Sequence, residues 1–183
     1  MKHLTSADYK VQPWANGRGQ TVELLRLEQD GALQLRLSMA TVAEDGAFSI
    51  FPGIERNLTV ISGPGFDLQG DGLHLTCAPL APVAFAGDVA VSATGTNNQP
   101  SDDFNVMTAR HLPRPQVTVV RGPATLPAGG RLYLFALGAA VVNETALSRH
   151  DLVMTDGPAR IVTPSDVIVV RVAGQDGQIA HPA

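Results

Sequence analysis

Residues 33–41, LQLRLSMAT, decide the fold class, because large apolar residues alternate there with polar or small ones. Successive side chains of a β-strand point to opposite faces, so a period of two predicts a strand with two different faces. The chain contains further short extended runs, at Thr21–Leu27, Leu58–Ser62, Val89–Thr94, Val117–Arg121, Arg131–Leu137 and Val167–Val172. We therefore predict a chain built mainly from short strands.

Glycine and proline, 18 and 13 residues respectively, are scattered along the chain and separate these runs. Neither suits the interior of a long helix, because glycine raises the entropy cost of ordering and proline removes a donor and clashes. The pattern predicts an all-β sandwich or barrel. From Ala139 to Asp156 both residues are missing, and either a helix or two strands joined at Asn143-Glu144 fits the pattern. The turn residues that flank the apolar pairs favour the strands.

The segment Leu112-Pro113-Arg114-Pro115 predicts an extended connector, because a residue that precedes proline is driven away from helical backbone angles. Extended runs and glycine-containing turns alternate on both sides of this segment. We therefore expect two β-halves, residues 1–112 and 113–183, that together make one compact unit.

Composition excludes several classes of protein. The 183 residues carry a net charge of −4, which argues against the basic surface that nonspecific nucleic-acid binding requires. Cys77 is the only cysteine, so no intrachain disulfide can form, and we expect it to be buried on a strand. The N-terminus resembles no signal peptide, and no window reaches the roughly 20 apolar residues of a membrane helix. We expect a soluble, cytoplasmic protein.

Metal and nucleophile signatures are also missing. None of the five histidines stands two to five residues from another, so the sequence predicts no metal site. His74 alternates with leucines and is expected on the polar face of a strand. There is no Gly-x-Ser-x-Gly elbow and no phosphate-binding Gly-x-x-x-x-Gly-Lys loop.

Three segments stand out, and each permits a structural and a functional interpretation. Residues 14–24, WANGRGQTVEL, predict a turn into a strand that either buries the tryptophan or brings it to a pocket mouth. In residues 36–58, RLSMATVAEDGAFSIFPGIERNL, Arg56 either binds a carboxylate beside the aromatics or pairs with Glu55 or Asp45. Residues 102–110, DDFNVMTAR, predict a solvated acidic turn followed by a strand.

In wording and order, these three segments resemble the HutD/Ves family of bicupins over roughly residues 10 to 112. The resemblance implies a double cupin, often a homodimer, associated with histidine utilisation and with pathway intermediates such as urocanate or formiminoglutamate as proposed ligands. It places the ligand-binding residues at matching positions of this chain, namely Asn16, Gly17, Ser38, Phe51, Arg56, Phe104 and Asn105. Arg18 and Ala109 depart from the family pattern, which commonly has a glycine and an arginine there.

Metal-dependent cupins carry a His-x-His strand motif, and the strand Leu33–Thr41 has no histidine, so the residues and the resemblance both predict a pocket without metal or other cofactor. We expect the protein to bind a small carboxylate rather than convert it. The alternative is a metal-independent enzyme acting on a related amide or imine, with Glu23, Asp103 or His111 handling protons. A third possibility is a protein whose ligand alters its affinity for a partner protein.

Overall fold

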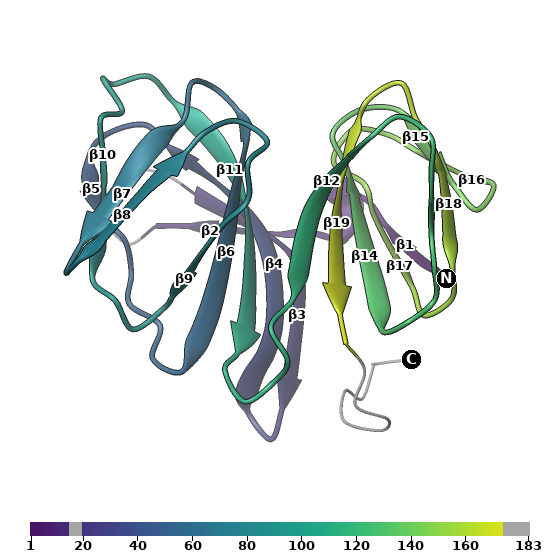
Figure 1. The fold of residues 1–183 in the computed structure, drawn as a ribbon, viewed down its shortest axis with the longest axis horizontal. Helices are drawn as coiled ribbons and strands as arrows, with labels where there is room; N and C mark the ends of the chain where they lie inside the picture. The colour runs from purple at the N-terminus through teal and green to yellow at the C-terminus, as the bar shows by residue number, and fades with distance from the viewer. Residues whose placement is uncertain (15–19, 174–183) are drawn as a thin grey trace. The chain divides into compact units, whose positions relative to one another are not determined.

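The structure, a computed structural model, describes residues 1–14 and 20–173. Over these residues the chain forms short strands and a single 3₁₀ helix, η1 (Ser6–Asp8), as Figure 1 shows. The prediction of an all-β chain is confirmed. Within the same residues, no helix has the length and apolar character needed to cross a membrane.

The chain divides into two compact units. One comprises Lys10–Leu112, and the other combines Met1–Tyr9 with the segment that begins at Pro113. The predicted connector therefore lies at the boundary, but the first nine residues do not belong to the first half as expected. The reason is that β1 (Lys2–Leu4) pairs antiparallel with β17 (Leu152–Thr155), a contact between residues too distant in sequence for any local pattern to indicate.

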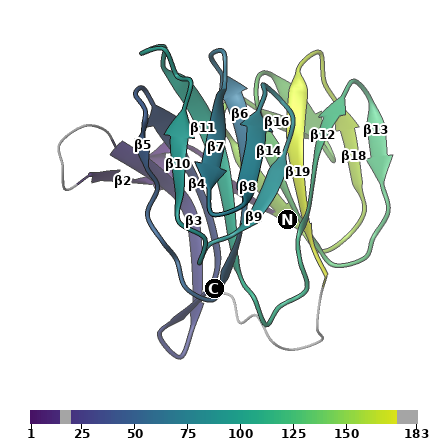
Figure 2. The ribbon, with the colours of Figure 1, turned by 60° about the vertical axis from the view of Figure 1, so that its left-hand side comes forward.

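The unit of residues 10–112 contains two antiparallel sheets, seen from two directions in Figures 1 and 2. The six-stranded sheet has the order β2-β3-β4-β11-β6-β9, with β2 (Lys10–Pro13), β3 (Gln20–Gln29), β4 (Ala32–Val42), β11 (Ser101–Ala109), β6 (Ile54–Ser62) and β9 (Val83–Ala86). The four-stranded sheet has the order β5-β10-β7-β8, with β5 (Gly46–Ala47), β10 (Val91–Thr94), β7 (Phe66–Gly70) and β8 (Leu73–Cys77).

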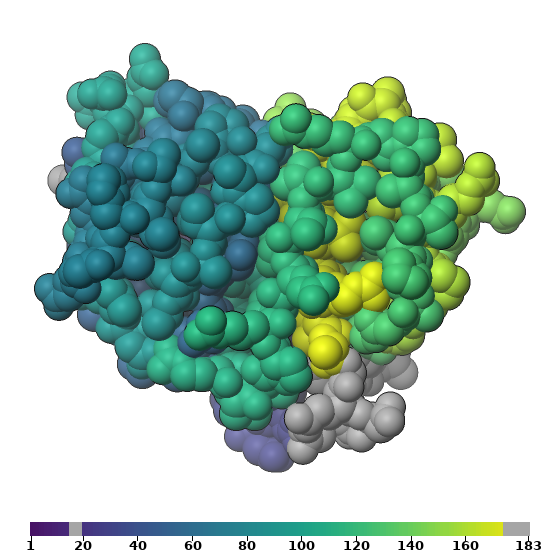
Figure 3. All heavy atoms as spheres, viewed as in Figure 1, coloured from purple at the N-terminus to yellow at the C-terminus, as the bar shows by residue number. Residues whose placement is uncertain are grey.

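A hydrophobic core joins these two sheets. Its buried side chains come from both, and they are Val42, Leu58, Val60, Phe66, Leu68, Cys77, Phe85, Val91 and Ala93. Figure 3 shows the face of this unit that β7, β8 and β9 form, in teal, where the atoms are closely packed. Cys77 is 1% exposed at the end of β8, which confirms its predicted burial, and His74 on the same strand is exposed as expected.

The second unit repeats the arrangement with a five-stranded and a four-stranded sheet. The former has the order β1-β17-β14-β19-β12, with β14 (Arg131–Ala136), β19 (Asp166–Val172) and β12 (Gln116–Arg121). The latter has the order β13-β18-β15-β16, with β13 (Ala124–Leu126), β18 (Ala159–Val162), β15 (Ala140–Val142) and β16 (Thr145–Leu147). Leucine, valine, isoleucine and alanine side chains from both sheets form its core.

The stretch without glycine or proline folds as strands, as predicted. β15 and β16 pair across the two-residue turn Asn143-Glu144, and β17 follows. Both turn residues have positive φ, 45° and 71°, as a tight hairpin requires. Asn143 also stabilises the turn, because its side chain donates to the carbonyl of Pro158 at 2.9 Å and accepts from the amide of Arg160 at 2.8 Å.

Candidate functional site

A cavity of about 410 Å³ lies within the unit of residues 10–112. This volume falls in the range of pockets that hold one small molecule, roughly 300–1,000 Å³. Its lining comes from β3, β4, β6 and β11, from the segment around β5, and from Trp14; the residues are Trp14, Thr21, Arg36, Ser38, Ala40, Val42, Ala47, Phe48, Ser49, Phe51, Arg56, Asp103, Asn105 and Met107.

Strand register explains why residues far apart in the sequence share this cavity. In an antiparallel sheet, directly paired residues present their side chains on the same face. Asn105 of β11 pairs with Ser38 of β4, and Met107 pairs with Arg36 on one side and Arg56 of β6 on the other. Alternate residues of each strand therefore point to the inner face of the sheet, and the polar residues among them line the cavity.

Arg56 lies at the centre of an aromatic cluster. Its guanidinium carbon is 4.9 Å from the ring centroid of Phe85 and 5.3 Å from those of Phe48 and Phe51. Such distances place the cation within range of favourable cation–π interactions, each about 0.5–2 kcal/mol depending on desolvation. The rings therefore hold the guanidinium in place without neutralising its charge.

The charge of Arg56 has no direct carboxylate partner among the described residues. The side chain is 6% exposed, and within the described residues it donates hydrogen bonds to uncharged acceptors, the carbonyl of Ser49 and Oδ1 of Asn105, both at 3.3 Å. Burial lowers the pKa of Arg56 to about 10, while the field of Asp103 opposes the shift and that of Arg36 adds to it. Arg56 nonetheless stays protonated at neutral pH, so the cavity contains a buried, unpaired cation.

Among the described residues that line the cavity, Asp103 is the only acidic one. It is 1% exposed and accepts a hydrogen bond from Nδ2 of Asn105. Burial raises the pKa of Asp103 to about 7; the field of Arg56 and the hydrogen bond from Asn105 oppose this shift, and Asp102 adds to it. This carboxyl group therefore changes charge near neutral pH.

A second arginine of the cavity, Arg36, is already paired. Its Nε donates to Oε2 of the buried Glu23 at 2.7 Å, and one terminal nitrogen is 3.4 Å from Oε1 of Gln12. The Glu23 carboxylate therefore compensates the Arg36 charge from the neighbouring strand. Arg56 is thus the uncompensated cation of the two.

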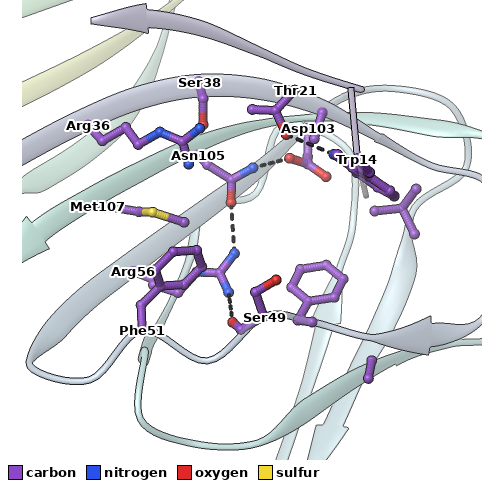
Figure 4. A pocket seen from close by; sticks show the side chains of 14 residues that line it. Trp14, Thr21, Arg36, Ser38, Ser49, Phe51, Arg56, Asp103, Asn105 and Met107 are labelled. Atoms are coloured by element: carbon purple, nitrogen blue, oxygen red, sulfur yellow. Dashed lines mark hydrogen bonds between the residues drawn. The ribbon is translucent and has the colours of Figure 1, made fainter. Parts of the chain in front are cut away.

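Figure 4 shows the arrangement of these groups. Asn105 lies between Arg56 and Asp103, and Phe51 lies at the Arg56 end. Trp14 and Thr21 lie at the Asp103 end, where Nε1 of Trp14 donates to Oγ1 of Thr21 at 2.9 Å. The cavity thus has a cationic, aromatic end and a carboxyl end, joined by one amide.

No group of three or more histidine, cysteine or acidic side chains comes close enough to hold a metal ion in the part of the chain that the structure describes. The acidic side chains near the cavity are engaged by Asn105 or Arg36. The chemistry available is charge-assisted hydrogen bonding, aromatic stacking and proton exchange at Asp103.

Comparison with known proteins gives the family. The model of the HutD family matches residues 6–169, nearly the whole chain. The chain belongs to the HutD family. HutD from Pseudomonas fluorescens SBW25, determined in a formate condition, is 28% identical and superposes with a TM-score of 0.85, covering 95% of this chain and 98% of that one. The conserved protein PA5104 from Pseudomonas aeruginosa PAO1 is 29% identical, with a TM-score of 0.83 and coverages of 94% and 98%.

More distant structures share the fold alone. The bacterial pirin YhhW from Escherichia coli, in complex with nickel(II), is 10% identical with a TM-score of 0.66, covering 95% of this chain and 99% of that one. Together with the two β-units, these neighbours show that the chain is a double cupin, as the HutD resemblance implied. Membership of the HutD family relates the protein to histidine utilisation.

Four of the residues that the HutD resemblance indicated line the cavity: Ser38, Phe51, Arg56 and Asn105. Phe104 does not, because it alternates with Asp103 and Asn105 along β11 and its fully buried side chain belongs to the opposite face of the strand. Asn16 and Gly17 lie outside the described residues, as does Arg18. Ala109 is buried at the end of β11 and is not part of the cavity lining.

The structure also decides between the alternatives for single residues of this HutD-family chain. Arg56 pairs with neither Glu55 nor Asp45, because Arg110 binds the former and Thr96 the latter. The predicted solvated turn at Asp102-Asp103 is wrong, since β11 begins at Ser101. The Asp102 carboxylate accepts hydrogen bonds from Thr41 and Ser62, which fixes the start of the strand.

Three residues in or beside the cavity were not singled out from the sequence. Arg36 and Met107 were recognised only as members of strands, and the register that brings them opposite each other requires the sheet order. Phe85 does not line the cavity and no sequence pattern indicated it, but it pairs with Arg56 and completes the aromatic cluster. The alternation of Asp103, Asn105 and Met107 was the available signal that these three residues share a face.

Proposed function

We propose that this HutD-family protein binds a small carboxylate in the cavity of the 10–112 unit and thereby modulates histidine utilisation. The expected ligands are pathway intermediates such as urocanate or formiminoglutamate. One observation carries the proposal: Arg56 is a buried cation that lines a cavity and has no direct carboxylate partner among the described residues.

The physical argument concerns the cost of an unpaired buried charge. Removing a cation from water is unfavourable unless a counter-charge or strong hydrogen bonds replace the lost hydration. The three aromatic rings around Arg56 compensate part of this cost but supply no negative charge. A carboxylate entering the cavity supplies that charge, and the planar guanidinium matches its geometry.

Further polar groups give the cavity specificity. Oγ of Ser38 is buried beside the cavity and has no hydrogen-bond partner among the described residues. Buried polar atoms without partners are rare in folded proteins and often belong to functional sites. Asn105 is held in one orientation by Arg56 and Asp103, so its amide is preorganised.

Isothermal titration calorimetry of the wild-type protein with urocanate, formiminoglutamate, formylglutamate and glutamate tests the proposal. A charge-assisted hydrogen bond contributes about 1.5–3 kcal/mol, so Arg56→Ala is expected to weaken binding roughly 10- to 150-fold. Arg121→Ala is the matched control, because Arg121 is 72% exposed in the other unit and leaves the cavity unchanged. Equal binding by Arg56→Ala and wild type would exclude Arg56 as the carboxylate-binding residue.

Arg56→Lys separates the loss of charge from the loss of shape. Lysine keeps a positive charge in the cavity but lacks the planar fork that binds a carboxylate with two hydrogen bonds. We expect its affinity to lie between those of wild type and Arg56→Ala. Circular dichroism of all variants checks that the β-fold is intact.

The second candidate function is catalysis, and one observation favours it. Of the three proposed proton-handling residues, Asp103 lines the cavity, and its pKa of about 7 suits a general acid or base. Glu23 is instead bound to Arg36, and His111 is exposed after β11. NMR spectra of each ligand after overnight incubation test this function: new signals that Asp103→Asn abolishes indicate an enzyme, and unchanged spectra indicate a binding protein.

A further inference from the structure

We infer that the cavity selects carboxylates whose opposite end carries an N–H donor, and that Asp103 accepts a hydrogen bond from that donor. The inference rests on the proposed function and adds to it a class of ligand and a residue that determines specificity. It follows from the way three side chains are connected in the cavity.

Asn105 connects the positively charged end of the cavity to its carboxyl end. Nη2 of Arg56 donates to Oδ1 of Asn105 at 3.3 Å, so the other end of the amide, Nδ2, must face away from the arginine. That nitrogen donates to Oδ1 of Asp103. The amide is therefore oriented by both neighbours, with a cation at its acceptor end and a carboxyl group at its donor end.

The acceptor capacity of Asp103 is only partly used. A carboxylate has two oxygens that together offer about four acceptor positions. The hydrogen bond from Asn105 occupies one of them, and no other donor among the described residues is bonded to Asp103. Trp14, which lies nearby in Figure 4, donates its N–H to Thr21 instead. Asp103 therefore has room for a further donor from within the cavity.

The two ends of the cavity are separated by a distance that a small molecule can span. Hydrogen bonds of about 3 Å on either side of one amide group put the guanidinium and the carboxyl roughly 6–8 Å apart. A ligand that engages both ends needs a carboxylate and an N–H group at a comparable separation. A simple monocarboxylate engages Arg56 alone and leaves Asp103 buried without a further partner.

A pair of ligands of the same shape tests this selection in the wild-type protein. Urocanate and 3-(2-furyl)acrylate share the carboxylate, the double bond and a planar five-membered ring, but the furan has no N–H group. We expect urocanate to bind roughly 10- to 150-fold more tightly in calorimetry, as one hydrogen bond to a charged group implies. Equal affinities would overturn the inference and leave the proposed function intact, whereas binding of neither ligand would refute both.

Two variants then test whether Asp103 is the acceptor. Asp103→Asn keeps the shape but offers a neutral acceptor, so the ratio of the two dissociation constants is expected to fall at least several-fold. Asp102→Asn is the matched control, because Asp102 precedes Asp103 on β11 and its carboxylate binds Thr41 and Ser62 outside the cavity. General destabilisation changes both affinities without changing their ratio. An unchanged ratio in Asp103→Asn would show that another group accepts the hydrogen bond.

Discussion

Replacing Asp103 by asparagine removes a buried, titratable carboxyl group while preserving the shape of its side chain. The pKa of this carboxyl rises from 3.8 to about 7 on folding, mainly because of burial. Between these two pH values the folded chain retains a proton that the unfolded chain has lost. The free energy of unfolding of the wild type therefore falls as pH rises through this window, and the loss is complete above the folded pKa.

The magnitude follows from the two pKa values. Each pKa unit corresponds to about 1.4 kcal/mol, and a pH change from 5 to 8 crosses roughly two units of the window. Asparagine does not titrate, so this contribution is absent from the variant. The free energy of unfolding of Asp103→Asn minus that of the wild type is therefore expected to increase by roughly 2–3 kcal/mol between pH 5 and pH 8.

Urea unfolding of both proteins at pH 5, 6, 7 and 8, followed by circular dichroism, measures this difference. The other titratable groups are common to both proteins and cancel in it. Asp103→Asn also places a neutral group at position 103, as protonation of Asp103 does in the wild type. A stability difference that stays constant from pH 5 to pH 8, or that shrinks as pH rises, would refute the assignment of Asp103 as a buried carboxyl with a raised pKa.

Three further predictions concern single residues. Trp14 is the only tryptophan and lines the cavity, so a carboxylate that does not absorb, such as formiminoglutamate, is expected to change its fluorescence saturably; no change at saturating ligand would place binding elsewhere. Burial raises the pKa of Cys77 to about 12, so its thiol is expected to react with a disulfide reagent only after unfolding, and rapid reaction of the native protein would contradict its burial. Glu144 has a φ of 71° in the turn after Asn143, so Glu144→Gly is expected to raise the free energy of unfolding by roughly 0.5–1 kcal/mol, and a lower thermal midpoint would contradict this.

Strands and turns were the part of the fold that sequence could predict. The alternation of residues 33–41 falls within β4, and the turn at Asn143-Glu144 joins two strands as expected. Both signals are local, since they depend on the preference of neighbouring residues for a pleated or a left-handed backbone. The pairing of β1 with β17 depends on residues about 150 positions apart, and no local preference contains that information.

The candidate site, like the fold, could be predicted from the sequence only in part. The family resemblance indicated Ser38, Phe51, Arg56 and Asn105, which line the cavity, but alternation along β11 excludes Phe104 from it. Which face of β4 is the inner one could not be read from the sequence, because alternation predicts two faces without showing which of them lines the pocket. The structure shows that the face with Arg36 and Ser38 is turned inward, where both residues line the cavity and Arg36 binds Glu23.

Asp103 illustrates why charge alone is a poor guide to exposure. Adjacent aspartates usually mark a solvated turn, and this was the expectation for residues 102 and 103. In the structure the two side chains point to opposite faces of one strand. Hydroxyl groups of Thr41 and Ser62 bind Asp102, and the amide of Asn105 binds Asp103. These partners come from two other strands and from a position two residues along β11, so they are recognisable only once the sheet is assembled.

The central claim, that Arg56 receives the ligand carboxylate, is tested most directly by NMR of the arginine side-chain Nε–H signals during a urocanate titration. Burial of Arg56 protects its Nε–H from exchange, and the signal is assigned by its absence from Arg56→Lys. We predict that this signal shifts saturably, with the same dissociation constant as calorimetry gives. Binding heat without any shift of the Arg56 signal would place the ligand elsewhere and contradict the account.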